Sequence, residues 1–185
     1  MFDANGNYAQ GIHPINPDQF EQLFVTDFTN SSTRQQIHTD LNTFLGNTKM
    51  AELLTFVSKI WLDGSFVTNK NNPNDIDGVI IINVTSDNAS IINEKVSEIS
   101  EYIAYSQRFS NLKIDFYVAP DPGPIQNDWD NIVSSIGLSN ARDLLQNAEL
   151  MYNYWKGKFT FDRNECAKGI FQILPSDING GDDNE

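Results

Sequence analysis

The chain has 185 residues, of which 39% are hydrophobic and 20% charged, with a formal net charge of −13 at pH 7. These values are typical of one folded globular domain and argue against an intrinsically disordered chain. So acidic a surface repels a nucleic-acid backbone, and the lone Cys166 excludes an intrachain disulfide and a cysteine-rich zinc site. No apolar run has membrane-spanning length and no secretory signal opens the chain, which together predict a cytoplasmic protein.

The first third of the chain is predicted to be mainly helical. Residues 1–15 have no clear period and are expected to follow the surface. Asn16-Pro17 is typical of a helix start, and a second helix is expected to begin near Ser31-Ser32 and to end at Gly46 or Asn47. A third short helix over 48–57 then leads into a strand at 58–63.

The middle of the chain alternates strands with a helix. A loop over 66–74 rich in turn-forming residues precedes a strand at 75–84, and Ser86 or Asp87 is expected to cap the next helix. That helix has the clearest amphipathic period in the chain, formed by Ile92, Val96, Ile99 and Ile103. A third strand is predicted over 112–118.

The last third is predicted to contain helices over about 129–155 and then a hairpin that pairs 159–161 with 169–174. The acidic residues 180–185 are expected to be a disordered tail. The sequence therefore predicts a single α+β domain over 1–179. It would consist of a small mixed sheet with helices packed on it, preceded by helices and followed by a helical and hairpin extension.

Two aspartates open the predicted strand at 75–84. Side chains alternate along a strand, so Asp75 and Asp77 would point to the same side with Ile76 opposite. Asp115 stands between apolar residues in the next predicted strand, where a buried carboxylate is costly without a cation or hydrogen-bond partners. The alternative interpretations are that Asp75 and Asp77 are turn residues after Pro73 and that Asp115 is a solvated position on an edge strand.

A Gly-Ser turn precedes these carboxylates. Gly64-Ser65 follows an apolar run and offers unhindered backbone amides to a phosphate. Oxygen ligands suit a hard divalent cation, and two such ions can neutralise the charge that develops during phosphoryl or nucleotidyl transfer. This combination indicates nucleotide chemistry.

Basic residues are sparse but partly gathered near the C-terminal end. Four of the twelve fall within thirteen residues: Lys156, Lys158, Arg163 and Lys168. They form either the solvated face of the predicted hairpin or a local edge that attracts phosphate. Lys168-Gly169 before an apolar strand is a candidate for closing over a nucleotide.

The pattern of Gly-Ser, nine intervening residues, Asp-x-Asp and a later strand Asp resembles the nucleotidyltransferase superfamily that includes DNA polymerase beta-like enzymes. The resemblance covers roughly residues 50–120. The fuller string Trp-Leu-Asp-Gly-Ser-Phe-Val-Thr, at 61–68, is also similar to a group of bacterial proteins with this core. Some minimal members of the superfamily act in toxin–antitoxin or antiphage modules.

The resemblance implies a role for each matching position. Gly64 and Ser65 would bind the triphosphate, Asp75 and Asp77 would hold Mg²⁺ against it, and Asp115 would complete a second metal site and help deprotonate the incoming hydroxyl. Two Mg²⁺ ions are implied, with Mn²⁺ as a substitute. Gly78 departs from the family, which usually has an apolar side chain there, and is expected to loosen the strand packing.

The implied activity is transfer of a nucleoside monophosphate from a nucleoside triphosphate such as ATP to a hydroxyl of a protein, a small molecule or an RNA end. The net charge disfavours RNA. A partner subunit or an oligomer is expected to supply acceptor recognition. The alternative is a non-catalytic module on the same fold that binds a nucleotide or a partner protein, as an antitoxin does.

Overall fold

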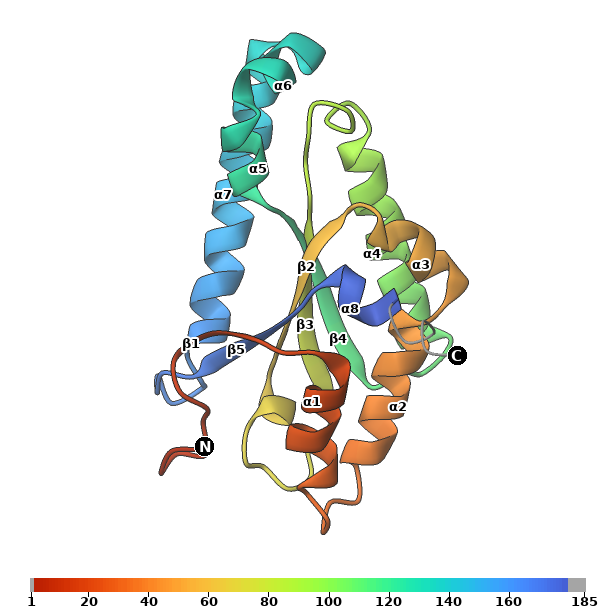
Figure 1. The fold of residues 1–185 in the computed structure, drawn as a ribbon, viewed down its shortest axis with the longest axis vertical. Helices are drawn as coiled ribbons and strands as arrows, with labels where there is room; N and C mark the ends of the chain where they lie inside the picture. Colours follow the sequence, from red (N-terminus) through yellow and green to blue (C-terminus); the bar gives the residue numbers. More distant parts are fainter. Residues whose placement is uncertain (1, 180–185) are drawn as a thin grey trace.

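A five-stranded mixed sheet with helices packed on it forms the centre of the protein, as the α+β prediction required (Figure 1). The computed structural model describes residues 2–179. Its strands lie in the order β1-β5-β2-β3-β4. Their bounds are β1 Gly11–Pro14, β2 Val57–Asp63, β3 Ile76–Ile82, β4 Ile114–Pro120 and β5 Gly169–Ile173.

Strand β3 runs antiparallel to β2 and parallel to β4, whereas β5 pairs antiparallel with β2 and parallel with β1. The run Val79-Ile80-Ile81-Ile82 in β3 has no exposed surface, because this strand has neighbours on both sides and helices over both faces. The centre of the sheet is therefore the most rigid place in the fold from which to present side chains.

One face of the sheet carries the larger core. Side chains of β2, β3 and β4 that alternate toward this face, such as Leu62, Ile80 and Phe116, pack against the helices that come before and between the strands. Those elements are α1 Pro17–Glu21, η1 Gln22–Thr26, α2 Arg34–Leu45, α3 Thr48–Leu54 and α4 Ile92–Arg108. Figure 1 shows α2, α3 and α4 on one side of the strands and α7 on the other.

The second face of the sheet is covered by the C-terminal half of the long helix α7, Leu138–Thr160. Trp155 and Phe159 of this helix pack on the smaller core formed by Trp61, Val79, Ile81, Ala119 and Ile170. The N-terminal half of α7 instead packs with the short helices α5, Pro122–Asn127, and α6, Trp129–Ile136. The second face thus has a single helix over it.

Several sequence predictions at the ends of the chain are wrong. Residues 11–14, for which no strand was predicted, form the mostly exposed strand β1 beside β5. The expected hairpin is absent, because α7 continues through Thr160 and only the single bridge Phe161–Ala167 pairs there, while β5 joins the sheet centre beside β2. A short helix α8, Pro175–Asn179, follows β5. The expected tail 180–185 lies outside the described residues.

Local capping also differs from the prediction at two helices. Helix α1 has the expected Asn16 cap, whose side chain accepts from the backbone of Gln19. Helix α2 instead begins at Arg34, whose backbone N–H donates to the Ser31 hydroxyl. Helix α4 begins at Ile92, so Ser86 and Asp87 belong to the preceding turns rather than to the cap.

A buried arginine ties the loop after the Gly-Ser turn to the helices. Arg34 is 1% exposed, and its guanidinium donates to the backbone carbonyls of Phe24, Phe66, Thr68 and Lys70 at 2.6–2.8 Å. It also lies 3.7 Å from the centre of the Phe28 ring, a cation–π contact. These carbonyls belong to short helical turns and a loop rather than to strands, so Arg34 supplies hydrogen bonds that no sheet partner provides.

We expect Arg34→Met to lower the free energy of unfolding by about 3 kcal/mol or more, because it removes charged hydrogen bonds and leaves buried carbonyls without donors. Urea denaturation followed by circular dichroism measures this. Arg142→Met, at an exposed position of α7, is the matched control and should change stability by less than about 0.5 kcal/mol. Equal effects of the two substitutions would contradict the assigned role of Arg34.

Candidate functional site

Three aspartates stand side by side across the sheet, at the C-terminal end of β2 and the N-terminal ends of β3 and β4. Asp63 in β2 is the register partner of Asp77 in β3, and Asp77 is the partner of Asp115 in β4. Register partners share a face, and neighbouring strands lie about 4.8 Å apart. All three carboxylates therefore lie on the face that α7 covers, with Trp61 and Val79 two residues along the same strands.

Asp75 adds a fourth carboxylate to this group. It precedes β3 and is half-buried, and its charge acts on Asp77, as does that of Asp115. The three residues predicted from the sequence as metal ligands are thus brought together. Asp63 joins them, and the antiparallel pairing of β2 with β3 is the signal that would have placed it there.

Burial and repulsion raise the pKa of Asp77 to about 6. The largest cause is loss of water around the carboxylate, and the negative charges of Asp75 and Asp115 add to it. The positive charges of Lys168 and Arg163 oppose the shift. At neutral pH the site therefore holds unfavourable negative charge that a bound cation would relieve.

The Gly64 turn packs directly against Asp77. Gly64 has a φ of 80° and a ψ of −163°, a conformation that side chains rarely adopt, and a Cβ built there would overlap the Oδ2 atom of Asp77. Ser65 then begins the short 3-10 turn η2, Ser65–Val67. Glycine is required here both for the backbone angle and for the close approach of the carboxylate, so the turn and the acidic group form one unit.

Lys168 lies within the site but is already paired. Its Nζ is 2.7 Å from Oδ2 of Asp63, and both residues are buried. Burial raises the pKa of Asp63 to about 7 although Lys168 opposes the shift, and Oδ1 of Asp63 has no hydrogen-bond partner among residues 2–179. Of the four residues of the predicted basic edge, Lys156, Lys158 and Arg163 are exposed, whereas Lys168 is buried and pairs with Asp63.

The donor set is rich in carboxylate oxygens, which suits a hard cation such as Mg²⁺. Within residues 2–179, however, no three carboxylate, imidazole or thiol groups converge closely enough to hold one metal ion as they stand. Asp115 instead accepts a hydrogen bond of 3.1 Å from the Tyr117 hydroxyl. The residues fit a magnesium site in chemistry and in strand placement, and their side chains would have to turn toward one point to bind it.

Gly78, the position that departs from the family pattern, does not loosen the sheet. It faces the larger core, and a Cβ added to it would meet the ring of Phe116 on the neighbouring strand β4. The aromatic ring fills the space that an apolar side chain at 78 would take. The departure thus leaves the packing beneath the acidic group intact.

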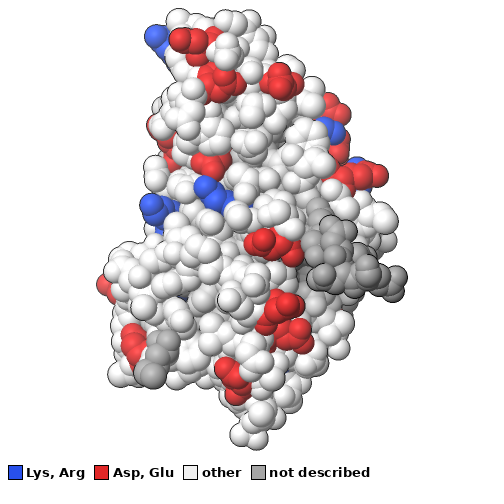
Figure 2. Space-filling view, in the orientation of Figure 1, with Lys and Arg blue, Asp and Glu red and all other residues white. Residues whose placement is uncertain are grey.

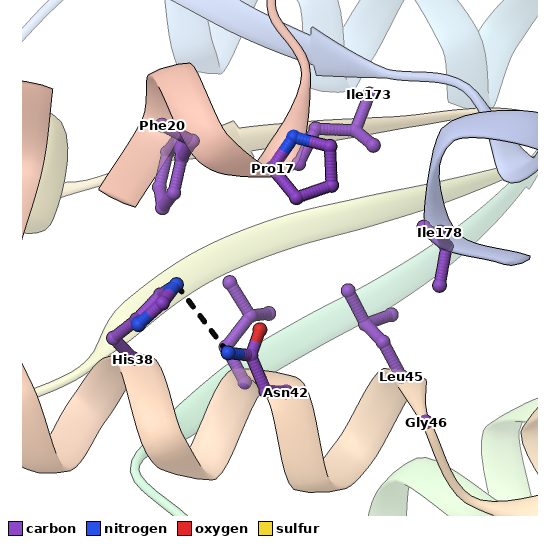
Figure 3. Close-up of a pocket in the computed structure, with 9 residues that line it drawn as sticks. Pro17, Phe20, His38, Asn42, Leu45, Gly46, Ile173 and Ile178 are labelled. Carbon is purple, nitrogen blue, oxygen red and sulfur yellow. Dashed lines mark hydrogen bonds between the residues drawn. The ribbon is translucent and has the colours of Figure 1, made fainter. Parts of the chain in front are cut away.

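A separate pocket opens among the helices of the larger core (Figure 3). Its volume is about 190 Å³, and it is bounded by α1, α2, the end of β5 and α8. His38 lies in its wall, where burial lowers the pKa of the imidazole against the opposing charge of Glu21. None of the carboxylates of the acidic site lines this pocket, so it is a different feature from the predicted site.

The protein thus has a mixed α/β fold, and four aspartates lie together at one end of its strands β2, β3 and β4: Asp63, Asp75, Asp77 and Asp115. The chain belongs to the family of unknown function DUF6932, whose model matches residues 1–174. This match spans every strand and every residue of the acidic site. No curated protein and no solved structure gives a significant match to the chain. No helix within residues 2–179 has the length and apolarity needed to cross a membrane.

We expect Gly64→Ala to destabilise the protein by about 1–3 kcal/mol, because alanine would adopt a strained φ and displace the Asp77 carboxylate. Gly157→Ala is the matched control: it lies in α7 with open space around it and should be neutral or stabilising by up to about 1 kcal/mol. Thermal unfolding of both variants tests this. A Gly64→Ala variant as stable as the wild type would contradict the close packing of the turn on Asp77.

The raised pKa of Asp77 predicts how stability depends on pH. Because the folded-state value, about 6, exceeds the unfolded value of about 3.9, protons favour the folded state, and the contribution of Asp77 to stability falls as pH rises from about 4 to 7. Asp77→Asn should therefore be more stable than wild type at pH 8, and this advantage should shrink at pH 5. The test is to measure the free energy of unfolding of both proteins at pH 5 and at pH 8. Other titrating groups contribute equally to the two proteins, so the difference reports on Asp77.

The same repulsion predicts a response to divalent cations. At pH 8, MgCl₂ should raise the thermal midpoint of the wild type above that in NaCl of equal ionic strength, because a bound cation would reduce the repulsion among the carboxylates. Asp77→Asn should show little of this difference. An equal response of both proteins would mean that the cation acts on the acidic surface at large.

Proposed function

We propose that this protein is a magnesium-dependent nucleotidyltransferase of minimal type, which transfers a nucleoside monophosphate from a nucleoside triphosphate to a hydroxyl and releases pyrophosphate. The proposal rests on the proximity of Asp75, Asp77 and Asp115 to one another and to the Gly64 turn. These residues are separated by up to forty positions in the chain. Asp77 and Asp115 are register partners in neighbouring strands, and Asp75, just before β3, lies close enough for its charge to act on Asp77.

The turn would bind phosphate, and the carboxylates would bind metal ions. Gly64 and Ser65 would bind the terminal phosphates through their backbone amides, with Mg²⁺ between the phosphates and the adjacent Asp77 carboxylate. Asp75 and Asp77 would hold Mg²⁺ against the triphosphate, and Asp77 and Asp115 would hold a second ion. When bound, these ions supply positive charge for the phosphate oxygens and lower the pKa of the attacking hydroxyl.

Asp115 would take the proton from the acceptor hydroxyl. It lies on the outermost strand, half-exposed, and already accepts a hydrogen bond from a hydroxyl group, that of Tyr117. A general base must lie within hydrogen-bond reach of the proton that it removes. This geometry supports entry of the acceptor hydroxyl from the β4 side of the site.

The charge of the surface bears on the nature of the acceptor. Figure 2 shows acidic side chains spread over the face in view, whereas basic ones are few and lie in small groups. Repulsion of a phosphate backbone by this surface favours a protein side chain or a small molecule over an RNA end. A protein acceptor supplied by a partner, within a toxin–antitoxin or antiphage module in the cytoplasm, fits this chemistry.

A second candidate function is a non-catalytic module that binds a nucleotide or a partner protein. Two observations favour it: the carboxylates do not converge on one point as they stand, and the ammonium group of Lys168 is bound to Asp63. A module of this kind would bind a nucleoside triphosphate with Mg²⁺ and would release no pyrophosphate.

A label-transfer assay separates the two candidates. The protein is incubated with Mg²⁺ and each of the four α-labelled nucleoside triphosphates, alone and with a bacterial lysate as acceptor, and pyrophosphate release is measured. We expect transfer from at least one triphosphate and a loss of at least about a hundredfold in Asp77→Asn, because a metal-bridging ligand is removed.

Asp87→Asn, at an exposed position outside the site, is the control and should retain full activity. Calorimetry with Mg²⁺ and each triphosphate is run in parallel. Binding without pyrophosphate release would support the module, and unchanged transfer by Asp77→Asn would count against the assigned site.

A further inference from the structure

An aromatic surface adjoins the acidic site on the β4 side. It consists of Tyr117 in β4 and of Tyr154 and Trp155 in α7. The ring centres of Tyr117 and Trp155 are 4.1 Å apart, and those of Tyr154 and Trp155 are 5.0 Å apart. The Tyr117 hydroxyl reaches Asp115, so this aromatic surface is joined to the carboxylates by a hydrogen bond.

The aromatic surface is both exposed and rigidly supported. Tyr117 is 37% exposed and Tyr154 56% exposed, whereas Trp155 behind them is only 8% exposed and packs against Phe159. A strand holds one ring and a long helix holds the other two. Exposed tyrosines are common singly, but here Tyr117 lies over the buried Trp155 at an interplanar angle of 31° and Tyr154 meets the same ring edge-on at 80°, so both tyrosine rings are held in place.

The aromatic surface lies at a distance from Gly64 that a bound nucleotide would span. Gly64, where phosphates would bind, follows β2, and Asp115 lies two strands away, roughly 10 Å across the sheet. Tyr117 lies two residues further along β4, on the same face as Asp115. A nucleotide with its terminal phosphates at Gly64 would therefore extend across the carboxylates and bring its base to Tyr117 and Tyr154.

A positive charge borders the same surface. The Nζ atom of Lys158 lies 5.8 Å from the ring centre of Tyr154 and 5.5 Å from that of Trp155. An ammonium group at the rim complements the carbonyl oxygens and ring nitrogens of a nucleobase, which accept hydrogen bonds. The surroundings are thus apolar over the rings and cationic at one edge, in contrast to the acidic site beside them.

We propose that Tyr117, Tyr154 and Trp155 form the subsite that stacks the base of the nucleotide. This assignment rests on the proposed function for the identity of the ligand, but the stacking itself requires neither metal nor transfer. Stacking on an aromatic face tolerates any base, whereas Lys158 at the rim favours bases that present acceptors to it.

The test uses uncharged ligands, which the acidic site does not repel. Adenosine, guanosine, cytidine and uridine are titrated without metal into the full-length protein, and binding is followed by tryptophan fluorescence and by NMR of the aromatic side chains. Ribose, which has no base, is the ligand control. We expect at least one nucleoside to bind and ribose not to bind.

Variants assign the binding to this surface. Tyr154→Ala should weaken nucleoside binding about tenfold, the cost typical of losing one stacked ring. Tyr154→Phe and Tyr117→Phe retain the rings and should bind normally, and the latter also removes the bond to Asp115. Tyr105→Ala removes a ring that is 57% exposed on α4 and should leave binding unchanged.

Each outcome bears on one proposal. Failure of all four nucleosides to bind, or equal effects of Tyr154→Ala and Tyr105→Ala, would overturn the stacking subsite even if label transfer is observed. Ring-dependent nucleoside binding without transfer from any triphosphate would uphold the subsite and count against the transferase.

Discussion

Repulsion among carboxylates at one edge of the sheet is the constraint on which the rest of this structure depends. Strand pairing places Asp63, Asp77 and Asp115 next to one another, and Asp75 adds its charge to theirs. A folded protein maintains such a group only where something compensates for it. Lys168 pairs directly with Asp63, and together with Arg163 it offsets only part of the repulsion at Asp77. The remaining unfavourable charge is the physical reason to regard this edge as a cation site.

The fold provides the rigidity that this arrangement needs. The strand β3 is buried on both faces by apolar residues, so Asp77 is held at the end of the stiffest element in the molecule. Arg34 of helix α2 ties the segment after Gly64 to η1 by donating to four backbone carbonyls. The segment after the Gly64 turn is thus held by Arg34 and Asp77 is held by β3, which supplies the preorganisation that the proposed phosphate-binding turn would need.

The two faces of the sheet differ in how completely helices cover them. Helices α1 to α4 close one face with a large core, whereas α7 alone covers the other and leaves the carboxylate end half-exposed. The open part of the second face holds the acidic group, the Gly64 turn and the aromatic surface of Tyr117 and Tyr154. A nucleotide lying along this face would meet phosphate-binding amides, carboxylates and aromatic rings in succession.

The sequence by itself determined the central strands, the amphipathic helices and the residues of the Gly-Ser and Asp-x-Asp motif. Alternation, a 3.6-residue period and motif spacing all depend on residues close together in the chain. It also indicated that Asp115 belongs to a strand. The tertiary structure decided which strands pair, and therefore that Asp63 stands beside Asp77, that Lys168 binds Asp63 and that β5 enters the sheet rather than a hairpin. It likewise decided that Tyr117 meets Trp155 across two elements. These contacts join residues far apart in the chain, and no local pattern records the packing that brings them together.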